Sequence, residues 1–335
     1  MKRAIYFFIF LLLVQTASAQ NEEAKRDLAF LKGTKDWFAA WQLISSEVFK
    51  INTVKPVQFV FFDDQYVYST STITIPKGSS VKGNNLMNLK LTWKKSLHHD
   101  TLTLPDQTKV PVGLMSFASE ANGNAFFVMP LLNFWQRAGV TSKELSTEKL
   151  VTGVFLHEFS HAQQMQNFGK KISSYENTIH FEAPFSDDIV QHLFGKNETY
   201  VNLFKEEVSF LYSSVKEEKL DWALVNKALE AMQNRQQIFF KDKFVALKEI
   251  DHFFLTMEGL GQYTMYLWLI HPKGGNITVP NAIIGVRRGS KWWSQDEGFG
   301  LFLVLDRLTA PSTWATGLFG NRTEDAVSLI KRFGK

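Results

Sequence analysis

Apolar and polar positions follow two different periods along this chain of 335 residues. Over residues 57–132, apolar residues come in short runs rich in β-branched and aromatic side chains, separated by turn residues such as Asp63-Asp64. Such runs are typical of strands. From about Ser146 onward, the apolar positions recur with the 3.6-residue period of helices. The pattern therefore predicts an α+β fold, with a strand-rich N-terminal lobe at 20–145 and a helical lobe at 146–335.

The same pattern predicts the individual elements. A helix is expected at 21–50, and Gly33 is expected to divide it because glycine weakens helices. The expected strands lie at 57–62, 66–75, 89–93, 102–104, 112–117 and 125–132. The expected helices lie at about 147–168, 185–195, 200–219, 221–250, 252–271, 297–309 and 323–334, with a loop at 272–291.

The first 19 residues have the pattern of a secretory leader. Lys2 and Arg3 form a basic start, an apolar run of about eleven residues follows, and Ala17-Ser18-Ala19 is a small-residue cleavage site. The apolar run is too short to span a bilayer. We therefore expect an exported protein, periplasmic or secreted, whose mature chain begins at Gln20.

A second apolar stretch, at 253–270, approaches the length of a membrane span. Glu258 and Gln262 lie in its middle, so we expect a buried core helix there instead. The sequence thus predicts no stable membrane span.

Composition narrows the chemistry that the chain can perform. It contains no cysteine, which excludes disulfides, iron–sulfur clusters and a thiol nucleophile, so any metal must be held by His, Asp or Glu. Without Lys2 and Arg3, the chain has 35 basic and 33 acidic side chains and no dense basic block. Nucleic-acid binding is therefore not expected.

The segment His157-Glu158-Phe159-Ser160-His161 carries the most specific chemical signal. Positions i and i+4 lie on one face of a helix, so His157 and His161 can both bind one metal ion at about 2.0–2.1 Å. Glu158 is rotated from His157 by about 100° around the helix axis. It is therefore placed to act as a general base on a water at the metal rather than as a ligand.

A helix is expected around this motif on independent grounds. Ser146 or Thr147 can cap its start, and Gly169 can end it. Leu150 and Val154 provide an apolar face that would pack on the core.

A catalytic zinc site needs a third protein ligand and an open position. Glu258 is the leading candidate, because a carboxylate inside an apolar helix is costly unless it is paired or bound to a metal. Gly259 and Gly261 beside it would let its helix lie close to the motif helix. His180 and Glu182 are competing candidates, because they lie closer to the motif in the sequence.

The pattern His157-Glu-x-x-His161 followed by Glu258 resembles that of the gluzincin zinc metallopeptidases, over roughly residues 125–310. The Glu-Gly-x-x-x-Tyr form at 258–263 looks like the second motif of several bacterial branches of that group. The resemblance implies a zincin-like fold, one zinc ion (Zn2+) per chain held by His157, His161 and Glu258, and Glu158 as the residue that polarises water.

The chain also departs from known branches of that group. It lacks the Gly-x-Met-Glu-Asn signature of the large aminopeptidase branch. Glu258 lies 97 residues after His161, which is far beyond the short spacing of thermolysin-like enzymes. The subfamily and the choice between endo- and exopeptidase action are therefore left open by the sequence.

Other residues are weaker candidates for the same site. Tyr263 could donate a hydrogen bond to the oxyanion that forms in the reaction, or could pack in the core. The stretch 124–135 is expected to be either an edge strand that holds an extended substrate, with Pro130 fitting an edge, or an ordinary core strand. Asp187-Asp188 and Glu206-Glu207 could orient the histidines or form a solvated acidic face.

These features together predict an exported zinc-dependent metallopeptidase that acts on a peptide or protein substrate. One alternative is an exported, non-catalytic binding protein on the same scaffold. Glu158 argues against it, because a purely structural metal site needs no base. A second alternative is a non-peptide amide hydrolase. The sequence does not indicate the oligomeric state.

Overall fold

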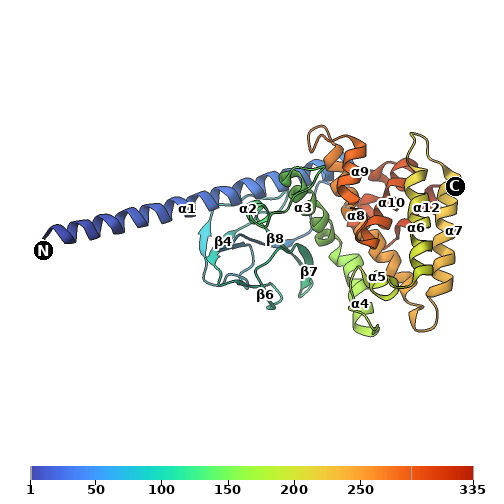
Figure 1. Ribbon diagram of the computed structural model, residues 1–335, viewed down its shortest axis with the longest axis horizontal. Helices are drawn as coiled ribbons and strands as arrows, with labels where there is room; N and C mark the ends of the chain where they lie inside the picture. Colours follow the sequence, from blue (N-terminus) through green and yellow to red (C-terminus); the bar gives the residue numbers. More distant parts are fainter. Residues whose placement is uncertain (1, 288, 335) are drawn as a thin grey trace.

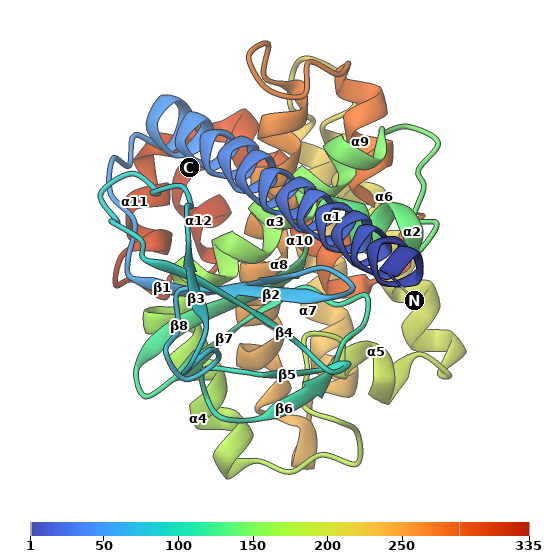
Figure 2. The same cartoon turned by 90° about the vertical axis from the view of Figure 1, so that its left-hand side faces the viewer.

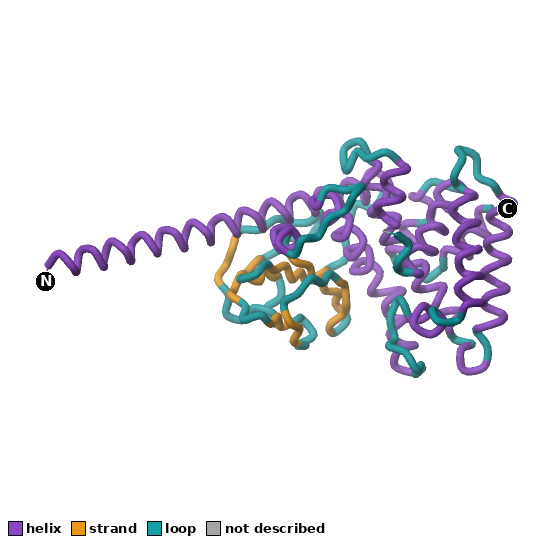
Figure 3. The backbone as a smooth tube through the Cα atoms, viewed as in Figure 1, coloured by secondary structure: helices purple, strands orange, loops and turns teal. Residues whose placement is uncertain are grey.

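The computed structural model describes the backbone of residues 2–287 and 289–334, and the side chains of residues 21–287 and 289–334. A mixed six-stranded sheet in the N-terminal part is followed by a mostly helical C-terminal part (Figure 1). Figure 3 shows the strands gathered in one region, with helices filling the rest. The predicted α+β class is therefore confirmed. The leader predicted at residues 1–19 lies outside the side chains that are described.

The N-terminal elements are α1 and eight short strands. α1 (Lys2–Leu43) runs directly into a π-helical turn, η1 (Ile44–Phe49). The strands are β1 (Val57–Phe62), β2 (Tyr66–Ser69), β3 (Ser79–Val81), β4 (Trp93–Leu97), β5 (Thr101–Thr103), β6 (Lys109–Pro111), β7 (Phe117–Ala121) and β8 (Asn124–Pro130).

The main sheet has the order β3-β4-β2-β1-β8-β7, and β5 pairs with β6 in a separate ribbon (Figure 2). β1 and β8 are parallel, with Val57 opposite Ala125, and the other pairs are antiparallel. Side chains alternate between the two faces of a strand. Phe59 and Phe61 of β1 therefore pack in the main core, whereas Val60 packs in a second apolar cluster with β5.

The long helix α1 continues through Gly33, so the predicted division of this helix was wrong. Its buried face is strongly aromatic: Trp37 packs on Phe61, and Phe38 packs on Phe59 of the sheet. This packing outweighs the roughly 1 kcal/mol that one glycine costs inside a helix.

The C-terminal part is built from helices. They are α2 (Leu132–Arg137), α3 (Thr147–Gln164), η2 (Met165–Gly169), α4 (Lys170–Thr178), α5 (Ile189–Phe194), α6 (Glu198–Ser214), α7 (Trp222–Phe239), η3 (Asp242–Phe244), α8 (Leu247–Ile270), α9 (Val279–Arg287), α10 (Trp293–Leu308), η4 (Pro311–Thr313), α11 (Ala315–Phe319) and α12 (Ala326–Phe333). Figure 1 shows α3, α8, α10, α6 and α7 following one another away from the sheet, and each packs on the next. α8 therefore lies between the motif helix and α10.

Several helices lie where the pattern predicted none, among them α2, α4, α9 and α11. α9 falls inside the predicted loop at 272–291, and α4 follows directly on the π-helical turn that ends at Gly169. Gly169 was expected to end the motif helix, but the chain stays helical through this turn. Within the part of the chain that the structure describes, no helix has both the length and the apolar character needed to cross a membrane.

A buried cluster of charged side chains ties α6, α7, α8 and α10 together. Arg235 on α7 donates to Glu207 on α6 at 2.7 and 3.1 Å and to Glu297 on α10 at 2.9 Å. Asp251 on α8 lies 3.9 Å from the same guanidinium. The guanidinium also donates a hydrogen bond to the hydroxyl of Tyr200. Three carboxylates thus face one guanidinium in the protein interior.

Three carboxylates around one guanidinium leave an excess of negative charge, which favours a proton on one of them. Burial raises the pKa of Glu297 well above its ordinary value, and nearby Glu207 adds to this effect while Arg235 opposes it. Burial also raises the pKa of Asp251. The proton therefore belongs to the folded state, and the stability that it contributes is present at low pH and lost as the pH rises.

Replacing Glu297 by glutamine tests this proton. Glutamine has the shape of the protonated acid but does not titrate, so it avoids the cost of ionisation in the folded state. We expect the free energy of unfolding of Glu297→Gln, relative to that of the wild type, to increase from pH 5 to pH 8 in urea denaturation. A relative stability that stays constant over this range would show that Glu297 is already ionised in the cluster.

Candidate metal centre

The motif residues lie in the middle of α3, and the local sequence explains why. The side chain of Ser146 caps the helix by accepting a hydrogen bond from the Lys149 amide at 3.3 Å. The predicted cap is thus confirmed at Ser146. The helix is buried over most of its length because it packs between α1, the sheet and α8.

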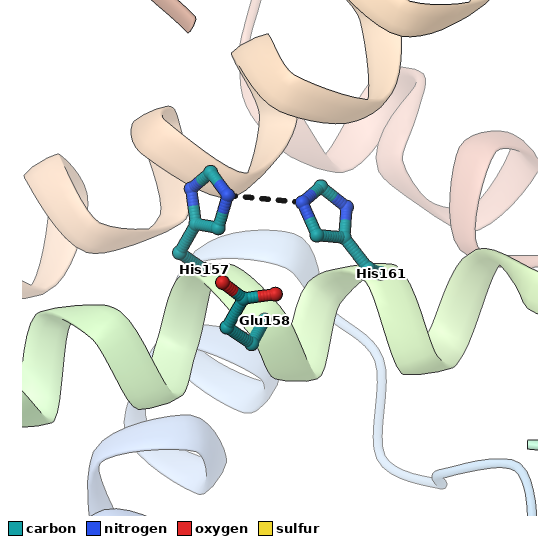
Figure 4. Close-up of side chains that lie close together, drawn as sticks. All are labelled: His157, Glu158 and His161. Atoms are coloured by element: carbon teal, nitrogen blue, oxygen red, sulfur yellow. Dashed lines mark hydrogen bonds between the residues drawn. The ribbon is translucent and has the colours of Figure 1, made fainter. Parts of the chain in front are cut away.

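The side chains of His157, Glu158 and His161 converge on one point, with ligand-type atoms within 4.8 Å of one another. Figure 4 shows the two imidazole rings facing each other from one side of α3, with the Glu158 carboxylate beside them. The Nε2 atoms of the two rings are 2.9 Å apart. Both histidines are buried, and Glu158 is half-buried.

Glu258 on α8 lies directly opposite the two rings. Its Oε1 is 3.1 Å from Nε2 of His161, and its Oε2 is 3.1 Å from Nε2 of His157. Oε2 is buried against Nε2 of His157. The fold therefore brings two ring nitrogens and one carboxylate together at one place. They come from helices about a hundred residues apart in the sequence.

These donors fit a metal ion in number, type and spacing. Donors bound at about 2.0–2.1 Å in a tetrahedral arrangement are about 3.3 Å apart. The observed separations of 2.9–3.1 Å need to widen by only a few tenths of an ångström. Two imidazoles and a carboxylate, with no thiolate, are the donors that a catalytic zinc site uses.

Two glycines allow α8 to approach its neighbours closely enough for this arrangement. A Cβ atom at position 261 would lie 2.7 Å from Nδ1 of His157, and one at position 259 would lie 2.4 Å from the backbone of Gly298 on α10. Gly261 therefore gives the predicted close approach to the motif helix. Gly259 serves the contact with α10 instead.

The charges at this point stabilise one another. Burial by itself lowers the pKa of His161, but the Glu258 carboxylate raises it to about 9. Burial by itself raises the pKa of Glu258, but His161 and His157 hold it well below its ordinary range. Glu258 is therefore ionised at neutral pH and supplies a negative charge for a cation. Because metal binding requires neutral imidazoles, a metal must displace the proton from His161.

A cleft of about 570 Å³ opens beside these residues. It is lined by His157, Glu158, His161 and Glu258 and, on one side, by the five consecutive residues 116–120. Successive side chains of a strand point to opposite faces, so a strand that lines a cavity with every residue presents its backbone edge to it. β7 is the last strand of the sheet, and among the described residues no further strand pairs with this edge.

Of the two alternatives for the stretch 124–135, the structure shows the ordinary core strand, and the open edge belongs to β7 instead. Residues 124–130 form β8, which is paired on both sides, with β1 and β7. Pro130 is its last residue, where proline is tolerated. The signal for β7 is the turn Asn122-Gly123, whose residues both have positive φ, 52° and 80°. Asn-Gly turns of two residues are the strongest short-range indication of a hairpin, and this one joins β7 to β8.

Some residues expected at the site lie elsewhere. The Tyr263 hydroxyl donates to Asp306, and Tyr263 does not line the cleft. His180 is exposed, and Glu182 is exposed and paired with Lys243 at 2.8 Å. The competing third-ligand candidates are therefore not brought to the histidines.

The two acidic pairs that could orient the histidines lie in different parts of the structure. Glu207 belongs to the Arg235 cluster. Asp187 is half-buried, lines the cleft and acts electrostatically on His161. Burial and the nearby charge of Glu258 raise the pKa of Asp187 to about 7.

Comparison of the chain with protein-family models, with curated proteins and with solved structures found no match. The function of the site is therefore argued from its own geometry.

Replacing Gly261 by alanine tests whether this close approach positions His157. The new methyl group would collide with the imidazole ring and displace it from Glu258. We expect the affinity for Zn2+, measured by competition with a chromogenic chelator, to fall about tenfold or more, as for other residues that position metal ligands.

Gly33→Ala is the matched control, because it also adds a methyl group inside a helix. Its Cβ would meet only the Trp37 ring, at an ordinary contact distance of 3.7 Å. Its zinc affinity should equal that of the wild type, with an unfolding free energy higher by about 0.5–1 kcal/mol. An unchanged zinc affinity in Gly261→Ala would show that the glycine at position 261 is not needed to position His157.

Proposed function

We propose that the protein is a zinc-dependent hydrolase that cleaves peptide bonds, with His157, His161 and Glu258 as the metal ligands. The observation that carries this proposal is the convergence of these three donors on a cleft that also contains Glu158 and the open edge of β7. A purely structural site would need neither the base nor the cleft.

A zinc ion in this position supplies a Lewis acid and lowers the pKa of water toward 7. Glu158 follows His157 on α3 and lines the same cleft, so its carboxylate lies where it can act as a base on a water at the metal centre. In the proposed reaction, Glu158 accepts the proton of the attacking water on a carboxylate oxygen and then transfers it to the leaving nitrogen of the peptide bond.

The edge of β7 supports a peptide as the substrate. An extended peptide can pair with an open strand through backbone hydrogen bonds, which hold it without regard to most of its side chains. Because residues 116–120 line the same cleft as Glu158, a peptide paired with β7 would pass the candidate metal centre. We include export, predicted from residues 1–19, in this proposal.

Glu158→Gln tests the proposed base. Glutamine keeps the size of the side chain but cannot accept a proton, so we expect hydrolysis of a mixture of fluorogenic peptides to fall by about 10²–10⁴-fold. Zinc content should remain that of the wild type, because Glu158 is not among the proposed ligands.

Glu148→Gln is the control on the same helix. Glu148 is exposed in the first turn of α3, far along the helix from the motif, so hydrolysis should be unaffected. A zinc-loaded Glu158→Gln protein with wild-type activity would contradict the role of Glu158. A zinc-loaded wild type that cleaves no peptide would favour the non-catalytic binding protein.

A further inference from the structure

Apart from His157 and His161, the ionisable side chains that line the cleft are all acidic. Besides Glu158 and Glu258, the lining includes Glu120, Glu176 and Asp187, and among its described residues there is no lysine or arginine. A cleft with walls of one sign concentrates ligands of the opposite sign. Away from the two histidines, Glu120 and Glu176 add two further carboxylates to the lining.

Helix α4 separates its charges between the cleft and the outside. Ile172, Ser173 and Glu176 line the cleft, at spacings that share one side of a helix. Lys170 and Lys171, on the same helix, are not part of the lining. Glu176 of α4 therefore faces the cleft, whereas Lys170 and Lys171 do not.

Glu120 comes from the edge strand β7 and is held in place by the hairpin turn. Its Oε1 accepts a hydrogen bond from the Gly123 amide at 3.0 Å, which leaves Oε2 for a ligand. Because β7 also presents its unpaired backbone edge, an extended peptide on this strand would place side chains near Glu120. The backbone edge is a separate observation that indicates a peptide ligand, independently of the acidic lining.

The cleft also has the size of a ligand site. Its volume of about 570 Å³ lies within the range of pockets that hold small ligands and short peptide segments. A lysine or arginine side chain of a bound peptide can pair with a carboxylate there, and arginine can do so with two parallel hydrogen bonds. An acidic side chain at the same place would meet like charge and be repelled.

We propose that the cleft selects peptides that carry lysine or arginine side chains, and that Glu120 and Glu176 are the residues that determine this selectivity. The inference rests on the proposed function, because it gives the substrate class of the same cleft. It concerns binding, however, and can be measured without catalysis.

The test measures peptide binding to the zinc-loaded Glu158→Gln protein, which should not consume its ligand. Three hexapeptides with blocked ends and a neutral fluorophore differ only at their two central residues, which are Arg-Arg, Leu-Leu or Glu-Glu. We expect fluorescence anisotropy to give the tightest binding for Arg-Arg, by about tenfold over Leu-Leu, and the weakest for Glu-Glu. The preference should narrow as salt is raised from 0.05 to 0.5 M, because exposed charges are screened.

Glu120→Gln and Glu176→Gln, combined in the same background, should weaken Arg-Arg binding about three- to tenfold and leave Leu-Leu binding unchanged. This size is what two exposed charge pairs are worth. Glu182→Gln is the control, since Glu182 is exposed and lies outside the cleft. It should change neither affinity.

Equal binding of Arg-Arg and Leu-Leu, or an Arg-Arg affinity that the double substitution does not change, would overturn the inference. The proposed function fails separately. A preference for Arg-Arg in a protein that hydrolyses no peptide would support the selectivity and contradict the hydrolase. Hydrolysis of all three peptides by the wild type at one rate, with equal binding, would support the hydrolase and contradict the selectivity.

Discussion

The buried carboxylate of Glu258 is the constraint on which the rest of this structure depends. An ionised carboxylate in an apolar helix is strongly unfavourable unless opposite charge or a metal compensates it. Here the compensation comes from His157 and His161, each with a ring nitrogen 3.1 Å from an oxygen of Glu258. The contact requires α8 and α3 to pack closely, which in turn requires a residue without a side chain at position 261. The placement of the three donors therefore depends directly on how closely the two helices pack.

The outer helices hold α8 in this position from the other side. Gly259 and Gly298 bring α8 and α10 into backbone contact, and the Arg235 cluster joins α10 to α6 and α7. A buried cluster of this kind contributes little net stability, but removing one partner is costly, so it favours a single arrangement of the helices. The sheet and α1 also pack on α3, with aromatic side chains in the main core. The motif helix thus packs between the sheet with α1 and the group of helices around α8.

The sequence predicts the parts of this arrangement that depend on local pattern. The motif helix and its Ser146 cap follow from spacing and capping preference, and Glu258 stands out because it interrupts an apolar helix. Position 261 is predictable for the same reason, since glycine in a helix suggests close approach. Gly33 shows the limit of that argument, because aromatic packing there keeps the helix intact.

What the sequence does not predict depends on tertiary partners. Strand order decides that β7, not β8, is the open edge, and no local pattern of residues 124–130 contains that information. Tyr263 lies one and a half turns after Glu258, yet its hydroxyl points to Asp306, because side chains at that spacing leave the helix in different directions. The acidic lining also combines residues from β7, α4 and the segment before α5, which only the fold brings together.

The central claim is that His157, His161 and Glu258 hold one zinc ion, and elemental analysis of the purified protein tests it most directly. After extensive dialysis, the wild type should retain about one zinc per chain, and Glu258→Ala should retain almost none while its circular dichroism stays that of a folded protein. A wild type that retains no zinc after reloading, or a folded Glu258→Ala protein that retains it fully, would contradict the account.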